Sequence, residues 1–264
     1  MLELRNVVKI FNRGTVDEKL ALDHLSLTIA DGEFVSVIGG NGAGKSTMLN
    51  AVSGSKLPDS GKVLLDGRDI TDLPEHKRAV WLGRVYQDPM MGTAAGMQIE
   101  ENLALALRRG KRRTLAPGIR KSERALFREK LAELGLGLED RLTARVGTLS
   151  GGQRQALTLL MATISRPDML LLDEHTAALD PKTAERVMTL TEKMVREQKL
   201  TTLMITHNMK DAIKYGDRLI MLHAGRIILD ISGEEKKALT VEELLRSFNR
   251  ASGEEFAADR AVLS

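Results

Sequence analysis

Gly39-Gly40-Asn41-Gly42-Ala43-Gly44-Lys45-Ser46-Thr47 is a glycine-rich run between a strand-like segment and a helical one. It satisfies the pattern of Gly, four residues, then Gly-Lys-Ser or Gly-Lys-Thr, which is typical of loops that bind phosphate. Glycine is needed because successive backbone N–H groups must turn toward phosphate oxygens, and side chains resist those dihedrals. Lys45 is predicted to contact the β and γ phosphates, and Ser46 to bind Mg²⁺. The run therefore predicts a nucleoside triphosphate site, with ATP as the expected nucleotide.

A second candidate feature is the segment Met169-Leu170-Leu171-Leu172-Asp173-Glu174, which indicates a buried strand that ends in two carboxylates. Ligands of open α/β sheets gather at the carboxyl ends of strands, so we expect these acids to face the phosphates. Asp173 is predicted to hold Mg²⁺ through its water shell, and Glu174 to orient or deprotonate the attacking water. Together with the glycine-rich run, the pair predicts a nucleotide hydrolase.

Hydrophobic periodicity predicts the order of elements around these motifs. Three strand patterns, at 2–11, 20–29 and 33–39, precede the loop, and we expect them to form a meander. Later strands alternate with helices, which indicates a parallel sheet. The other predicted elements are helices at 46–53 and 181–197, strands at 62–65, 83–87, 169–172 and 203–206, and a hairpin at 218–223 and 226–231. A helix-rich, basic region at about 98–165 is interpreted as an inserted helical subdomain.

Composition is ordinary for a globular protein, with 42% hydrophobic and 28% charged residues among 264. The 39 basic and 36 acidic side chains nearly balance, so composition gives no argument for nucleic-acid binding. Zero cysteines exclude disulfides and thiolate metal sites. Residues 1–10 alternate like a strand, unlike a signal peptide, and no apolar run approaches the ~20 residues that span a bilayer. If this protein acts at a membrane, we expect another chain to span it.

Leu149-Ser150-Gly151-Gly152-Gln153 begins a segment with helical apolar spacing. Ser150 and Gln153 fit a capping box, which is a purely structural explanation. A capping box does not need the two glycines, whereas glycines would let a phosphate approach the helix N-terminus closely. The segment matches in full the signature motif of the ATP-binding cassette (ABC) ATPases, and it precedes the acidic strand as in that family. The chain therefore resembles ABC ATPases.

The resemblance implies roles for further residues. Gln87 matches the glutamine that senses the metal and links the core to the helical subdomain, and Asp180 matches the aspartate of the D-loop. His207 matches the switch histidine that contacts the γ phosphate. Phe11 is placed like the aromatic residue that stacks on adenine, although Phe34 is also nearby in sequence. Three of them have a structural alternative: His207 as a surface histidine, Gln87 as a strand-end amide and Phe11 as a core aromatic.

The resemblance implies an α/β fold, with a P-loop NTPase (RecA-like) core, an N-terminal antiparallel β subdomain and an inserted α-helical signature subdomain. It places one ATPase domain at 1–250, with its core at about 1–88 and 160–232 and its helical subdomain at about 89–159. A short C-terminal helix and tail are expected at 233–264. One departure is His175, where the family usually has proline. His175 is expected either to titrate near the γ phosphate or to be a tolerated variant that leaves the acid pair unaffected.

In this family two subunits face each other head to tail, so each ATP lies between one chain's loop and the partner's Ser150-Gly151-Gly152-Gln153. The resemblance implies ATP and Mg²⁺ as cofactors and a homodimer, or a heterodimer with a second ABC ATPase. It also implies an integral membrane permease and, indirectly, a substrate-binding protein as partners, and a peripheral location on the cytoplasmic face of the cell membrane. No nucleic acid is expected.

A separate chain of this size, with a helical insert after Gln87, is more similar to a bacterial importer subunit than to an exporter half. Segments 88–101 and 173–180 also resemble a group associated with uptake of amino acids, aromatic ones among them. An exporter subunit and a soluble cassette ATPase, as in metal-cluster assembly, stay open as alternatives. Cassette proteins of translation and DNA repair carry two cassettes, coiled coils or zinc fingers, which this sequence lacks. The basic run 108–113 is interpreted as a solvated face.

Overall fold

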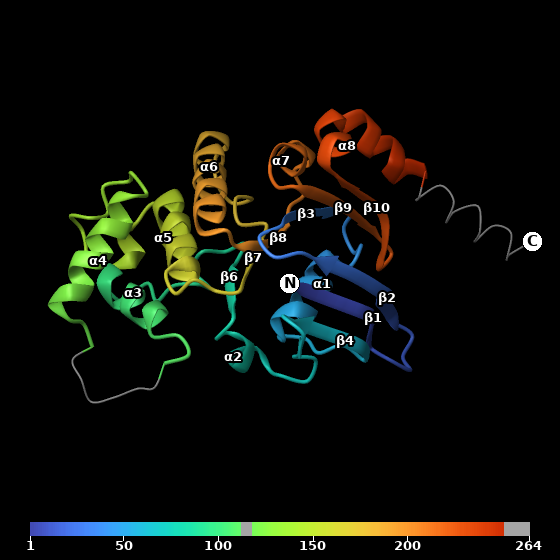
Figure 1. Cartoon of the computed structure of the whole chain (residues 1–264), viewed down its shortest axis with the longest axis horizontal. Coiled ribbons are helices and arrows are strands. Elements are labelled where there is room, and N and C mark those ends of the chain that lie inside the picture. Colours follow the sequence, from blue (N-terminus) through green and yellow to red (C-terminus); the bar gives the residue numbers. More distant parts are fainter. Residues whose placement is uncertain (112–117, 251–264) are drawn as a thin grey trace, which may run out of the picture. The chain divides into compact units, whose positions relative to one another are not determined.

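The computed structural model describes residues 1–111 and 118–250, and it divides into two compact units. Unit 1 comprises Met1–Arg78 and the described part of Thr201–Ser264, and unit 2 comprises Ala79–Leu200. Figure 1 shows the chain, with most helices and strands of both units labelled. The expected tail beyond residue 250 lies outside the described residues.

Unit 1 holds two groups of paired strands and four labelled helices. Its elements are β1 (Leu2–Phe11), β2 (Lys19–Ile29), β3 (Phe34–Gly39), α1 (Lys45–Ser53), β4 (Ser60–Leu65), β5 (Arg68–Asp69), α2 (Glu75–Arg78), β8 (Thr201–Ile205), α7 (Met209–Lys214), β9 (Arg218–His223), β10 (Arg226–Ser232) and α8 (Gly233–Ala238). The first group is antiparallel, in the order β2-β1-β4-β5, and the second runs β10-β9-β3-β8. The expected antiparallel subdomain and the strand that leads into the loop are therefore both present.

The course of β3 corrects the predicted meander. β1 and β2 form an antiparallel pair, but β3 pairs in parallel with β8 and β9, so that Val37 lies opposite Ile205 and Ile220. β3 is buried along almost its whole length, whereas burial alternates along much of β2. A continuously apolar strand suits a sheet that is covered on both faces, and an alternating strand suits a sheet with one exposed face. The third strand therefore leaves the hairpin and joins the other sheet.

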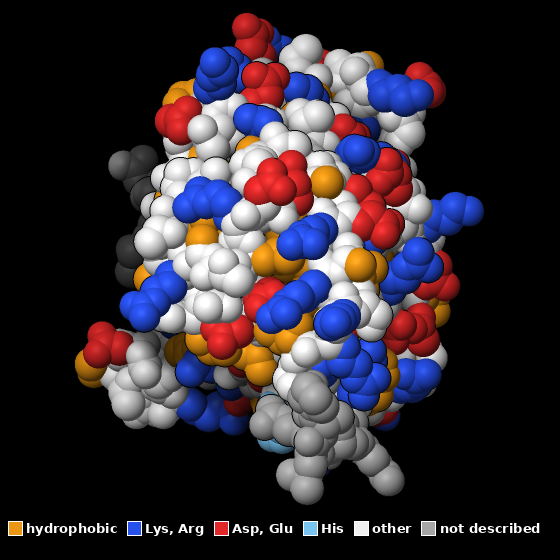
Figure 2. Space-filling view, turned by 90° about the vertical axis from the view of Figure 1, so that its left-hand side faces the viewer, with side chains coloured by type: hydrophobic (Ala, Val, Ile, Leu, Met, Phe, Trp, Pro, Cys, Tyr) orange, Lys and Arg blue, Asp and Glu red, His pale blue; other side chains and the backbone are white. Residues whose placement is uncertain are grey.

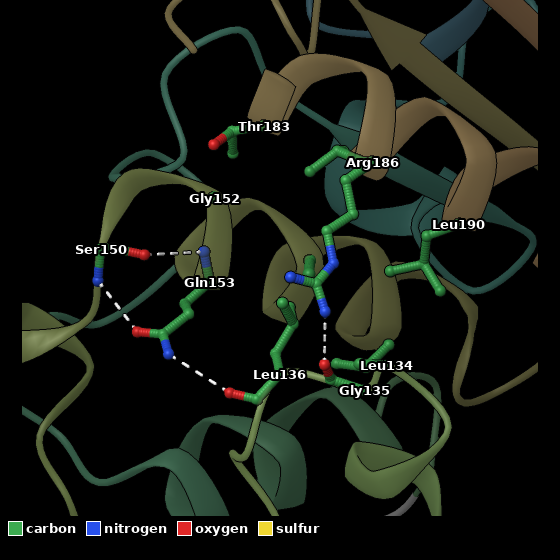
Figure 3. Close-up of a pocket in the computed structure, with 11 residues that line it drawn as sticks. Leu134, Gly135, Leu136, Ser150, Gly152, Gln153, Thr183, Arg186 and Leu190 are labelled. Carbon is green, nitrogen blue, oxygen red and sulfur yellow. Dashed lines mark hydrogen bonds between the residues drawn. The ribbon is translucent and has the colours of Figure 1, made fainter. Parts of the chain in front are cut away.

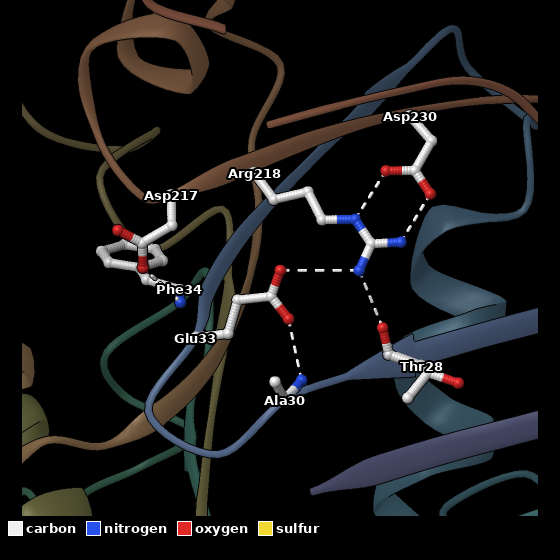
Figure 4. A network of polar contacts seen from close by, with 7 residues as sticks. All are labelled: Thr28, Ala30, Glu33, Phe34, Asp217, Arg218 and Asp230. Atoms are coloured by element: carbon white, nitrogen blue, oxygen red, sulfur yellow. Dashed lines mark hydrogen bonds and ion pairs between the residues drawn. The ribbon is translucent and has the colours of Figure 1, made fainter. Parts of the chain in front are cut away.

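Arg218 connects the turn between β2 and β3 to the β9–β10 hairpin (Figure 4). Its guanidinium donates to both carboxylate oxygens of Asp230 at 2.5 Å and to the Thr28 carbonyl at 2.8 Å. It also contacts Glu33, which accepts from the Ala30 N–H. Bidentate, charge-assisted bonds of this kind are strong, and the bond with Asp230 raises the pKa of Arg218. The network fixes the entry into β3 and hence into the phosphate loop.

Arg78, the last residue of α2, binds the C-terminal end of α1, the helix that follows the phosphate loop. Its side chain is fully buried, and it donates to the carbonyls of Ala51 and Val52 in the last turn of α1, at 2.7 and 2.8 Å. It donates also to the Leu73 and Thr71 carbonyls, at 2.7 and 2.8 Å. Burial lowers the pKa of Arg78 to about 10, so the side chain stays charged at neutral pH. Arg78 thereby satisfies carbonyls that have no partner inside the helix.

The carboxyl-terminal part of unit 1 packs over β3 and β9. Residues 241–250 are helical, and Leu244 is fully buried in a cluster with Ile38 of β3 and Leu219 and Met221 of β9. Residues from α7 pack against the same cluster. The short C-terminal helix predicted from the sequence is thus two helical segments, α8 and 241–250, and the second is anchored in the core.

Unit 2 carries the helical part of the chain and a parallel strand pair. Its elements are β6 (Leu82–Val85), α3 (Ile99–Leu107), α4 (Lys121–Ala132), a 3-10 turn (Val146–Thr148), α5 (Gly151–Thr163), β7 (Met169–Asp173) and α6 (Pro181–Gln198). β6 and β7 are parallel. Across residues 1–111 and 118–250, no helix is both long and apolar enough to cross a bilayer.

The basic run 108–113 is not a solvated face at its first two positions. Arg108 pairs with both carboxylate oxygens of Glu123 at 3.0 Å. Arg109 donates to the carbonyls of Leu82 and Met161 at 3.0 and 2.7 Å, and its burial lowers its pKa. These arginines tie α3 to α4, β6 and α5, and residues 112 and 113 lie outside the described residues. On the face shown in Figure 2, acidic and basic side chains are interspersed.

Candidate nucleotide-binding site

The phosphate loop of unit 1 curls around its own lysine. The Lys45 ammonium donates to the carbonyls of Gly39 and Gly40, at 2.7 and 3.0 Å, and is nearly buried. Gly44 adopts φ 102°, and a Cβ there would meet the Ala21 carbonyl oxygen at 2.6 Å, so only glycine fits. α1 begins at Lys45, one residue before the predicted start, and ends at Ser53 as predicted. The loop presents an ammonium and a helix N-terminus, both of which attract phosphate.

His207 follows the strand next to the loop. β8 ends at Ile205 opposite Val37 of β3, and the Thr206 N–H donates to the Val37 carbonyl at 3.1 Å. Because the two strands are parallel, the phosphate loop and His207 leave the same edge of unit 1. His207 is exposed there. This is the placement that a γ-phosphate sensor requires, and that role stays a prediction.

The end of the β1–β2 hairpin also approaches the loop. Phe11 pairs with Lys19 across the hairpin, and a Cβ on Gly42 would lie 3.0 Å from the Lys19 Nζ. The Phe11 side chain is half-buried, whereas Phe34 is fully buried in the core. Phe34 is therefore excluded as a stacking residue, and Phe11 keeps the predicted role. Sequence reasoning missed Lys19, whose only signal was a basic residue at the start of the second strand.

Two predicted site residues lie at the carboxyl ends of the parallel strands β6 and β7 in unit 2. Gln87 lies two residues beyond β6 and is exposed, and Asp173 ends β7, with Val85 opposite Leu172. Asp173 forms an ion pair with Arg84 at 3.1 Å. Arg84 was missed, although a charge inside a predicted buried strand signals an acidic partner. The ion pair orients the carboxylate that is proposed to hold the metal.

His175 points into unit 2 and not toward solvent. It is 2% exposed, and its Nε2 lies 3.1 Å from the Thr191 hydroxyl on α6. That hydroxyl donates to the Val187 carbonyl at 2.8 Å, so it accepts from an Nε2–H of the histidine. Burial lowers the pKa of His175 to about 4. The structure therefore favours the tolerated structural variant over a second titrating group.

We expect acidification from about pH 6.5 to about pH 4 to remove about 3 kcal/mol of stability through His175. The unfolded chain takes up a proton at the ordinary pKa of 6.5, whereas the folded chain resists protonation down to about 4. Unfolding therefore binds a proton across this window. Urea unfolding of the parent and of His175→Gln, compared across the window, measures the effect.

His76→Gln removes an exposed imidazole and should leave the pH profile of stability unchanged. The His175→Gln profile should be flatter than that of the parent. Parallel profiles for the parent and His175→Gln would contradict a buried, neutral histidine.

The signature segment forms a complete capping box at the start of α5 (Figure 3). The Gln153 N–H donates to the Ser150 hydroxyl at 3.3 Å, and the Ser150 N–H donates to the Gln153 side chain at 3.2 Å. The Gln153 amide also donates to the Leu136 carbonyl at 3.3 Å. The structural explanation of Ser150 and Gln153 is thus correct. A binding role for the segment stays a prediction beside it.

The two signature glycines pack against the start of α6. A Cβ on Gly152 would lie 2.3 Å from Thr183 Cγ2, and one on Gly151 would lie 3.3 Å from Leu179 Cδ2. Asp180 caps α6 by accepting from the Thr183 N–H at 3.1 Å, and this bonding lowers its pKa. A cavity of about 330 Å³, lined by Ser150 and Thr183 among others, lies beside this contact (Figure 3). The signature segment and the start of α6, with the predicted D-loop residue Asp180, therefore lie side by side within unit 2.

Each unit, taken by itself, holds one predicted metal ligand with the oxygen donor that Mg²⁺ prefers. Ser46 exposes its hydroxyl in the first turn of α1, and Asp173 presents a carboxylate with 18% side-chain exposure. Mg²⁺ prefers hard oxygen ligands and is held by one or two protein groups together with substrate phosphates. When bound, Mg²⁺ would neutralise charge on the triphosphate.

Comparison with known proteins gives a family match over more than half of the chain. The family model described as ABC transporter matches residues 22–177. A tyrosine transport ATP-binding protein of Clostridioides difficile is 50% identical over 252 residues, covering 95% of this chain and 100% of that protein. A methionine import ATP-binding protein of Rhizobium johnstonii is 39% identical over 211 residues, covering 79% of this chain. The chain spans only 56% of that second relative.

Solved structures give the same result for the fold. A dimeric ATP-binding cassette in a post-hydrolysis state, bound to ADP and phosphate, is 31% identical with a TM-score of 0.75. It covers 88% of this chain, and the match takes in 98% of that structure. The ADP conformation of another transporter cassette is 27% identical with a TM-score of 0.76, covering 94% of this chain and 98% of that one.

Proposed function

This chain belongs to the ABC transporter family, and we propose that it energises the uptake of an aromatic amino acid, tyrosine above all. The predictions of an α/β P-loop fold, of ATP hydrolysis and of an importer subunit are confirmed by the family match and by the relatives. One observation carries the substrate proposal: a relative named for tyrosine transport is half identical over its entire length. The methionine importers share less identity over a smaller part of this chain.

Within the hydrolysis cycle, the site residues keep their predicted roles as proposals. Lys45 and the backbone N–H groups of 39–47 hold the phosphates, and Phe11 stacks on adenine. Glu174 orients or deprotonates water, while His207 and Gln87 sense the γ phosphate and the metal. The parallel pairing within each unit supports these assignments, because it brings the carboxyl ends of neighbouring strands together.

For partners, we propose a homodimer and an integral membrane permease. The dimeric cassette structure supports the dimer. In the proposed dimer, Ser150 to Gln153 of one chain would contact the nucleotide of the other. Met90 and Met91, three and four residues after Gln87, are 45% and 71% exposed. Exposed methionines adapt to an apolar partner, so this segment is a fitting contact for the permease. The chain would then sit at the cytoplasmic face of the membrane as a peripheral subunit.

Tyrosine uptake by whole cells tests the substrate proposal. Deleting the gene in the organism that encodes this chain should abolish high-affinity uptake of labelled tyrosine, while uptake of labelled methionine and spermidine persists. Parent protein should restore uptake. Lys45→Ala should not restore it, because the loop then lacks its phosphate-binding ammonium.

Two outcomes would contradict this proposal in different ways. Loss of methionine uptake with intact tyrosine uptake would show a different substrate within the importer class. Restoration by Lys45→Ala to the parent level would show that transport does not depend on this chain's phosphate loop.

A further inference from the structure

The ring of Phe248 lies against the phosphate loop. Phe248 belongs to the helical residues 241–250, and a Cβ on Gly40 would lie 3.1 Å from its Cζ and 3.3 Å from its Cε2. The ring also meets His223 at the end of β9 edge to face, with centroids 5.8 Å apart and planes at 87°. The half-buried ring is therefore held between the loop and the end of β9.

Neither the loop pattern nor the backbone requires glycine at position 40. It is one of the four variable positions between the first glycine and Gly-Lys-Ser. The positive φ angles of the loop belong to Gly39, Gly42 and Gly44, at 153°, 79° and 102°, and not to Gly40. Any small side chain could adopt this backbone, so what glycine provides at position 40 is room for the ring of Phe248.

The same peptide group supports the lysine of the loop. The Gly40 carbonyl accepts from the Lys45 ammonium at 3.0 Å and from the Ala43 N–H at 3.2 Å. Phe248 is in turn fixed by its helix, because Leu244, one turn earlier, is fully buried against Ile38. A chain of direct contacts therefore runs from the core under the C-terminal helix through Phe248 and Gly40 to the ammonium.

We propose that the helix 241–250 positions the phosphate loop. Phe248 is the positioning residue, and Gly40 is the residue of the loop that it contacts. Packing of the ring fixes the Gly40 peptide and thereby the place of the Lys45 ammonium. Coupling between two sites is reciprocal, so nucleotide in the loop changes the stability of the helix. The proposal rests on ATP binding by the loop and does not depend on which solute is transported.

A double-mutant cycle on ATP affinity tests this contact with the purified full chain. Gly40→Ala places a methyl group against the ring, and this overpacking should displace the Gly40 peptide and lower ATP affinity about tenfold. Phe248→Ala should lower it about threefold by freeing the loop. The double variant should bind ATP no more weakly than Phe248→Ala alone, because the new methyl then has room. Such non-additivity marks residues in contact.

Leu245→Ala, on an exposed position of the same helix, is the matched control and should bind ATP like the parent. Thermal unfolding of each variant checks that the fold is intact. Additive losses in the double variant, or a parent-like affinity of Gly40→Ala, would overturn the proposal. If the uptake experiment shows that the substrate is not tyrosine, the ATP affinities in this cycle are unaffected. The proposal on Phe248 and the proposal on tyrosine uptake can therefore fail separately.

Hydrogen exchange provides a second readout of the reciprocal effect. Adding ATP with Mg²⁺ should slow amide exchange in residues 241–250 of the parent, and this slowing should shrink in Phe248→Ala. Identical exchange with and without nucleotide in the parent would overturn the proposed coupling.

Discussion

Replacing Glu174 with glutamine is expected to lower the steady-state rate of ATP hydrolysis roughly 100- to 10,000-fold, the range that a general base contributes. Glutamine keeps the length of the side chain and an acceptor oxygen but cannot take up a proton. Glu174 follows β7 with a φ of 45°, a left-handed backbone that is uncommon for a non-glycine residue and typical of functional sites. ATP binding should persist, because Lys45 and its loop are unchanged. The ATP-bound dimer should therefore accumulate.

Three measurements separate these effects: phosphate release for the rate, equilibrium binding for nucleotide, and light scattering for the dimer. Glu185→Gln makes the same carboxylate-to-amide change at an exposed position of α6 and should leave all three unchanged. A Glu174→Gln variant that hydrolyses ATP at the parent rate would exclude Glu174 as the base. A variant that no longer binds ATP would instead assign Glu174 to nucleotide binding.

Replacing Arg78 with methionine is expected to lower the free energy of unfolding by roughly 3–5 kcal/mol. Methionine fills much of the volume but removes donors from four carbonyls, those of Ala51, Val52, Thr71 and Leu73. Buried carbonyls without donors carry their full desolvation penalty. Two of these carbonyls lie in the last turn of α1. The C-terminal end of α1 should therefore fray.

Urea unfolding followed by circular dichroism measures the loss for Arg78→Met. Lys77→Met, at the exposed neighbouring position, is the matched control and should change stability by less than about 0.5 kcal/mol. Arg78→Lys should recover only part of the loss, since one ammonium cannot reach all four carbonyls. A loss below about 1 kcal/mol for Arg78→Met would show that water replaces the guanidinium, contrary to its complete burial.

Local patterns predicted the elements well where the pattern itself fixes the conformation. β1 and β9 have the predicted bounds, and α1 ends at Ser53 as predicted, with Gly54 at φ 82° as its C-cap. Helix caps and turns depend on residues within about four positions, so they are legible in sequence. The Ser150 capping box was predicted for the same reason.

Predictions that depended on distant partners were less successful. The meander was wrong because the periodicity of 33–39 reports burial but not which strand lies beside it. The interpretation of the basic run as a solvated face was wrong at Arg108 and Arg109. Arg108 pairs with a carboxylate, and Arg109 donates to backbone carbonyls of other elements. Arg84, the ion-pair partner of Asp173, was missed for the same reason.

By itself, the sequence determined the local backbone of the phosphate loop, because glycine spacing and a lysine at a helix start are typical of loops that bind phosphate. With the signature motif and the acidic strand end, it also determined the family and the ATPase activity. Only the tertiary structure decided that His175 is buried and neutral, that Arg78 closes α1, and that Phe248 rests on Gly40. Those outcomes depend on contacts between residues far apart in the chain, and burial and hydrogen bonding at such contacts are set by packing, which no local pattern records.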